Sequence, residues 1–176
     1  GNFYESGIPV GAKIDHLKQS ILKTGLVLDL DASNLDSYPK SGTFWHDLTL
    51  RKQKGSISGS NPFYNNEFRF ETDTDSFITV DGTQGLSPQK FGFATYFQPF
   101  YNGSGSNDVI AGKSFNGSDL SFGHFFKSSS SLVSTIRFTD GTKSEVELSN
   151  INQDSFHNIF TRWDGSRHIV YTGGYF

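Results

Sequence analysis

The chain has 176 residues, a length that suits a single all-β domain and allows a substantial buried core. Its net charge of −3, with Lys and Arg scattered along the sequence, argues against a nucleic-acid binder, which needs a concentrated basic surface. Cysteine is absent, so no disulfide framework is expected, and no apolar run reaches the ~18 residues of a membrane span.

Aromatic residues make up 15% of the chain, although apolar residues altogether make up only 34%. Each aromatic side chain can bury about 150–250 Å², so a few of them can fill a core. The 19 glycines predict many tight turns, and the composition is that of a β-rich globular protein. Methionine is absent, so we expect that the chain is processed or is a segment of a longer product.

Residues 1–24 are expected to form an N-terminal arm followed by one short helix. Residues 1–13 have no periodicity, and their apolar side chains suit either docking on a neighbour or a frayed terminus. Residues 14–23 predict a helix, because one apolar stripe recurs at helical spacing. The stripe consists of Ile14, Leu17, Ile21 and Leu22.

Residues 25–49 predict the nucleus of a β-sandwich. Leucine alternates with other residues over residues 26–30, which predicts a strand. Short polar residues then end the strand at a corner, because they bond their own backbone. A second apolar element returns through Trp45.

The segment L-D-A-S-N-L-D-S-Y-P-K-S-G-T-F-W-H-D-L resembles the opening of laminin-G-like, concanavalin-A-type jelly-roll domains of phage and other virion structural proteins. Twelve of the eighteen positions over residues 31–48 match the family pattern. The resemblance implies a jelly roll of two antiparallel sheets over residues 25–176. It also implies that certain residues are scaffold residues of the corner, namely Asp31, Asn34, Tyr38, Trp45 and Asp47.

Further strands are predicted in order along the chain. Short strands are expected at residues 56–58, 63–70 and 77–80, and longer ones at 91–99, 108–113, 120–127, 132–138 and 144–148. Residues 139–142 and the pair Asp164-Gly165 predict hairpin turns. Residues 156–174 resemble the family's closing hairpin, after which a further strand is usual. We expect that strand to be supplied by the N-terminal segment, by a longer chain or by another subunit.

Catalysis was tested against the residue patterns that it requires. Glu145 and Glu147 share one face of a strand, and retaining glycosidases need two carboxylates about 5 Å apart. No third acid or aromatic platform accompanies them, so the two carboxylates are interpreted as part of the solvent-exposed face of a hairpin. His157 and His168 flank one hairpin, eleven residues apart, a spacing that allows them to approach each other. Zinc needs three or four ligands, so the histidines are predicted to be core or surface residues. The chain is therefore predicted not to be an enzyme.

Two binding sites remain as candidates. Glu71, Asp73 and Asp75 alternate through a turn and are the candidate ligands of a calcium ion, with a solvated acidic turn as the alternative. Sugars stack on aromatic side chains beside amides and carboxylates, and two clusters carry these groups. The candidate carbohydrate-binding residues are Tyr101, Asn102, Asn107 and Asp108, with Tyr64, Asn65 and Asn66 as a second cluster.

The resemblance implies a non-enzymatic structural protein of a phage-like virion, in the capsid decoration, tail or fibre. Such a protein would assemble in the host cytoplasm, pack as a homo-oligomer and contact other virion proteins. The alternative function is a glycan-binding module for host attachment or cell-surface adhesion, in which weak contacts gain from repetition.

Overall fold

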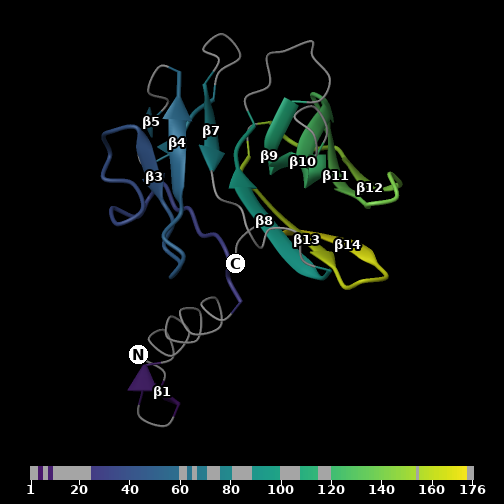
Figure 1. Cartoon of the computed structure of the whole chain (residues 1–176), viewed down its shortest axis with the longest axis horizontal. Helices are drawn as coiled ribbons and strands as arrows, with labels where there is room; N and C mark the ends of the chain where they lie inside the picture. The colour runs from purple at the N-terminus through teal and green to yellow at the C-terminus, as the bar shows by residue number, and fades with distance from the viewer. Residues whose placement is uncertain are drawn as a thin grey trace. The chain divides into compact units, whose positions relative to one another are not determined.

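The computed structural model (Figure 1) describes residues 4–5, 8–9, 25–59, 63–64, 67–70, 76–80, 89–99, 108–114, 120–153 and 155–173. These residues form β-strands and no helix, and every strand pair is antiparallel. The all-β prediction is therefore confirmed. The helix predicted over residues 14–23 lies outside the described residues. Within the described part of the chain, no helix is long and apolar enough to cross a membrane.

The chain divides into two compact units, Gly1–Gly85 and Leu86–Phe176, and each is described by itself. In the first unit, β3 (Phe44–His46), β4 (Lys54–Ser58) and β7 (Phe77–Val80) form a sheet in the order β3-β4-β7. Two short hairpins accompany it. They are β1 (Tyr4–Glu5) with β2 (Ile8–Pro9), and β5 (Phe63–Tyr64) with β6 (Glu67–Phe68).

The strand predicted at residues 26–30 is wrong, because this segment is not paired in a sheet. Its residues are all half-buried, so burial does not alternate between two faces. The backbone of Asp29 bonds to the turn after β3 instead: Leu48 N donates to Asp29 O at 2.9 Å, and Asp29 N donates to Asp47 Oδ1 at 2.9 Å. These bonds occupy the groups that a neighbouring strand would use.

The Asp47 carboxylate is the polar centre of the first unit, and the side chain is only 1% exposed. Oδ1 accepts from Asp29 N and Thr49 N at 2.9 Å each, and Oδ2 accepts from Thr49 Oγ1 at 2.5 Å and Gln53 N at 3.4 Å. Burial opposes ionisation, but the bonds from Thr49, Asp29 and Gln53 outweigh it and hold the pKa of Asp47 below its ordinary value. The charged carboxylate therefore joins the predicted corner to β3 and the loop before β4.

The corner itself is closed by Ser37 and Tyr38, both fully buried. Ser37 Oγ accepts from Asp31 N at 3.2 Å and donates to His46 O at 2.6 Å, while Tyr38 OH donates to Gly42 O at 3.1 Å. The ring centroid of Phe68 lies 4.8 Å from that of Tyr38 and 4.5 Å from that of Trp45. The scaffold role predicted for Tyr38, Trp45 and Asp47 is confirmed. Asp31 and Asn34 accept backbone bonds within the turns of the same corner.

The second unit is a β-sandwich of two sheets. One contains β8 (Phe91–Phe97), β13 (His157–Trp163) and β14 (His168–Gly173) in the order β14-β13-β8. The other contains β9 (Asp108–Ser114), β10 (Leu120–Ser128), β11 (Ser131–Arg137) and β12 (Lys143–Ser149) in the order β12-β11-β10-β9. Among the described residues, the edge strands are β12 and β9 in one sheet and β14 and β8 in the other, and β12 and β14 face one another across the sandwich.

The core lies between these sheets and confirms the predicted alternation of β8, whose inward side chains are half-buried. The ring centroids of Phe91 and Phe122 are 4.9 Å apart, and those of Phe97 and Phe126 are 6.0 Å apart. Rings of β8 therefore pack against rings of β10. Phe126 packs with Leu132 and Ile151, and around them lie Phe97, Ile110 and Leu148. The predicted hairpin turns at 139–142 and 164–165 are also present.

We predict that Asp47→Ala lowers the free energy of unfolding by about 3 kcal/mol, because three backbone amides lose their acceptor at a buried position. Asp47→Asn, which keeps one oxygen, should lose less. Urea unfolding measures the change. Asp36→Ala is the matched control, since its side chain is exposed in the same corner. Equal stability of the Asp47→Ala and Asp36→Ala variants would contradict the role given to Asp47.

Candidate functional site: a groove beside a buried histidine network

Most candidate site residues from the sequence lie outside the described residues. These are the calcium candidates Glu71, Asp73 and Asp75, and the carbohydrate candidates Tyr101, Asn102 and Asn107. Asp108 is exposed as the first residue of β9. Within the described part of the chain, no group of three or more His, Asp or Glu side chains could hold a metal ion.

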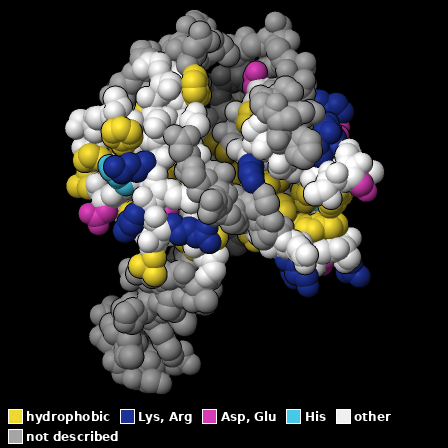
Figure 2. All heavy atoms as spheres, in the orientation of Figure 1, with side chains coloured by type: hydrophobic (Ala, Val, Ile, Leu, Met, Phe, Trp, Pro, Cys, Tyr) yellow, Lys and Arg dark blue, Asp and Glu magenta, His cyan; other side chains and the backbone are white. Residues whose placement is uncertain are grey.

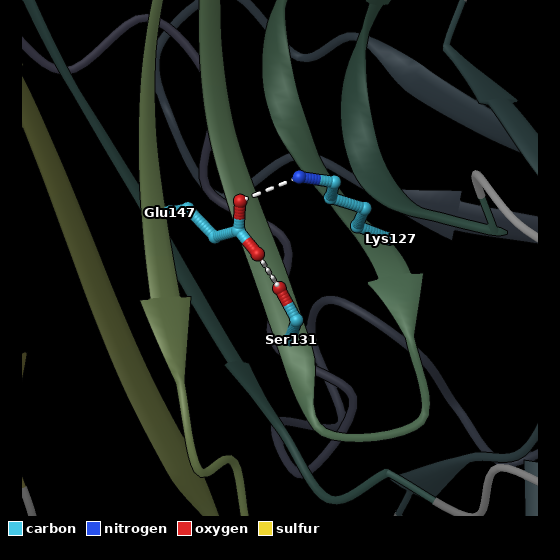
Figure 3. Close-up of polar contacts among 3 residues, drawn as sticks. All are labelled: Lys127, Ser131 and Glu147. Atoms are coloured by element: carbon cyan, nitrogen blue, oxygen red, sulfur yellow. Dashed lines mark hydrogen bonds and ion pairs between the residues drawn. The ribbon is translucent and has the colours of Figure 1, made fainter.

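Glu145 and Glu147 lie on the solvent-facing side of β12, as the sequence predicted, and Figure 3 shows Glu147 with its partners Lys127 and Ser131. Glu147 reaches across β11: its Oε2 accepts from Lys127 Nζ at 2.7 Å and its Oε1 from Ser131 Oγ at 2.5 Å. The bond from Lys127, followed by that from Ser131, holds the pKa of Glu147 below its ordinary value. A glycosidase acid needs a raised pKa, so this carboxyl is set up for pairing and not for proton donation.

A groove of about 500 Å³ opens where β12, β13 and β14 converge. Its lining includes aliphatic side chains, amides and hydroxyls. The lining residues are Glu147, Leu148, Ser149, Asn150, Ile151, Phe156, His157, Asn158, Ile159, Thr172 and Gly173. Ligand sites have volumes of about 300–1,000 Å³, a range that includes this groove.

An exposed aromatic face adjoins the groove on the outer side of the β14-β13-β8 sheet. We define it by Tyr96, Phe156, Phe160 and Tyr171. The Tyr96 and Phe156 rings are parallel within 3° at a centroid distance of 5.2 Å, and Phe160 lies 5.9 Å from Tyr171. Tyr96 is 66% exposed, Phe156 48% and Tyr171 46%. Figure 2 shows hydrophobic side chains at the surface around β13 and β14, next to Lys and Arg.

Gly92 lets the aromatic face pack closely on the sheet. A Cβ at this position would lie 2.8 Å from Phe160 Cε2, so the ring occupies the space of the missing side chain. Beside it, Lys90, Arg162 and Asp164 help to line a second hollow of about 360 Å³. The aromatic face is thus bordered by charged side chains at one end and by the groove at the other.

A continuous chain of hydrogen bonds crosses the sandwich beneath this surface. His124 of β10 contacts Thr95 Oγ1 through Nδ1 and Thr161 Oγ1 through Nε2, at 2.8 Å each. Ser134 Oγ then joins Thr161 Oγ1 at 2.7 Å to His168 Nε2 at 3.0 Å, and His168 Nδ1 lies 3.1 Å from Ser144 Oγ. His124 and Ser134 are fully buried and Thr161 is 2% exposed.

Two neutral imidazoles satisfy this buried histidine network completely. Each neutral ring has one donor and one acceptor nitrogen, and each hydroxyl can donate once while accepting once. A single direction of donation can therefore run from Thr95 to Ser144. Burial, with a smaller effect of His168, lowers the pKa of His124 to about 4, and burial also lowers the pKa of His168. The histidines are structural at neutral pH.

Sequence reasoning missed the network, because its members come from distant strands of both sheets. It predicted only that the histidines are core or surface residues. The approach of His157 to His168 that the spacing allows does not occur: His168 pairs with Trp163, whereas His157 lies at the opposite end of β13. Inward alternation of Thr95 with Phe91, Phe93 and Phe97 was the one available signal that a hydroxyl enters the core.

Comparison with protein families, with curated proteins and with solved structures finds no match.

We predict that the free energy of unfolding falls as the pH drops from about 6.5 to about 4. In this range His124 is protonated in the unfolded chain and neutral in the native state, so protons favour unfolding. The loss at this residue should approach about 3 kcal/mol, and the lowered pKa of His168 acts in the same direction. Urea unfolding at several pH values measures it.

In His124→Gln the amide keeps a donor and an acceptor but does not titrate, so the pH dependence should become shallower. His157→Gln removes a histidine outside the network and serves as the control. An unchanged slope in His124→Gln would refute the assignment.

Proposed function

We propose that this chain is a non-enzymatic structural module of a phage-like virion, in the capsid decoration, tail or fibre. It acts through packing against further copies of itself and against other virion proteins. In this proposal the sandwich has jelly-roll connectivity, particles assemble in the host cytoplasm, and nucleic acid is not a ligand. The resemblance of residues 31–48 to virion jelly rolls and the absence of cysteine support it.

The observation that carries the proposal is the exposed aromatic face. Large exposed aromatic side chains that lie together on one sheet are uncommon on monomers and typical of interaction surfaces. Tyr96, Phe156 and Tyr171 are each about half exposed or more, yet their rings are ordered by stacking on neighbours. Such a preformed surface can associate with little loss of side-chain entropy.

Open sheet edges give a second reason to expect association. β12 and β14 each pair with one neighbour among the described residues. Edge strands offer backbone donors and acceptors to another chain. Repeated copies in a particle would cover both the edges and the aromatic face.

We predict that the protein forms a concentration-dependent oligomer in sedimentation velocity, and that Tyr171→Arg raises its dissociation constant about tenfold or more, because a charge then enters the packed aromatic face. Val109→Arg is the control, since Val109 is 54% exposed in the other sheet of the sandwich. A monomer at every concentration up to millimolar, or equal effects of both variants, would contradict the proposal.

A glycan-binding module is the second candidate function. The groove beside Phe156 favours it, because this groove places amides and hydroxyls next to an exposed ring.

A further inference from the structure

The groove between β12, β13 and β14 has an aromatic wall of fixed orientation. Phe156 lines it and is 48% exposed, so part of the ring remains accessible. Tyr96 stands behind Phe156 with its ring parallel within 3°. Because the two rings stack, a ligand that contacts Phe156 meets a surface that is already oriented.

Polar side chains also line the groove. Asn150 and Asn158 supply amides, and Ser149 and Thr172 supply hydroxyls. An amide side chain offers two donors and an acceptor, and a hydroxyl offers a donor and an acceptor. Asn150 adopts a positive φ of 63° directly after β12, a conformation that asparagine tolerates. The turn that presents its amide is thus set by the backbone.

The charge of the lining selects against anions. Among the described residues that line the groove there is no Lys or Arg, and the one carboxylate belongs to Glu147. That carboxylate already binds Lys127 and Ser131 on the outer face of the sheet (Figure 3). A phosphate, a sulfate or an acidic peptide would find no cation here to balance its charge.

We infer that the groove is a binding site for a neutral glycan. A pyranose ring has an apolar C–H face, which fits against Phe156, and hydroxyl edges, which both donate to and accept from Asn150, Asn158, Ser149 and Thr172. A volume of about 500 Å³ admits a short saccharide, and aliphatic residues such as Leu148 are also in the lining. Individual contacts are weak, so binding gains from many copies on one particle. This inference rests on the second candidate function, glycan binding, for which it names the site and the class of ligand, and it does not require the structural role.

The test is isothermal titration of the full chain with neutral tetrasaccharides, namely cellotetraose, maltotetraose and N-acetylchitotetraose, preceded by an array of neutral glycans. We expect binding by at least one neutral glycan. Phe156→Ala should weaken it about tenfold through loss of ring contact. Asn150→Gly should weaken it too, and glycine accepts the positive φ without strain.

Tyr171→Ala is the matched control for Phe156→Ala. Tyr171 is 46% exposed and belongs to the same aromatic face, but it does not line the groove. Glycan affinity should therefore be unchanged in Tyr171→Ala, and thermal unfolding of each variant shows whether the fold is retained. The Tyr171→Arg variant should lose self-association and keep glycan binding, so failure of the structural role and failure of this site are distinguishable.

Three results would overturn the inference. One is the absence of any signal on the neutral array with dilute and assembled protein. Another is preference for a heparin tetrasaccharide over every neutral one. The third is loss of self-association in both Phe156→Ala and Asn150→Gly without effect on glycans, because the groove would then receive a strand of a second copy.

Discussion

The sandwich of the second unit depends on a polar contact through its middle. His124 of one sheet bonds both Thr95 and Thr161 of the other, and Ser134 and His168 extend the chain of bonds. A buried hydrogen-bonding group without a partner costs about 1–3 kcal/mol, so the sheets must keep the relative position that satisfies every member. Aromatic packing around Phe122 and Phe126 supplies the apolar burial, whereas the network specifies the alignment.

In the first unit, a buried carboxylate makes the hydrogen bonds that align the surrounding segments. Asp47 accepts from amides on both sides of the corner, and its hydrogen bonds keep it charged although it is buried. Both units therefore place polar groups at the centre of the packing, which suits a chain with only 34% apolar residues. Because each group is fully satisfied only in one arrangement, such contacts favour a unique fold over a merely collapsed one.

This interior arrangement leaves distinctive side chains at the surface. In β8 the inward positions hold Phe91, Phe93 and Thr95, so Tyr96 must face outward. β13 and β14 follow the same register and place Phe160 and Tyr171 on the same outer face of the sheet. The aromatic face and the groove at its end are thus direct consequences of the strand register, and they are the surfaces on which the proposed packing and glycan binding depend.

The sequence alone determined the β class, most of the strands, the hairpin turns and the corner residues, because alternation, glycine-containing turns and short polar side chains act locally. It did not determine the fate of residues 26–30, whose alternation predicts a strand, although Asp29 bonds to Asp47 and Leu48 instead. Tertiary structure alone decided that His124 enters a buried network, and that Leu148 of β12 and Thr172 of β14 border one groove. These contacts join residues from separate strands, and only the packing of two sheets brings such residues together.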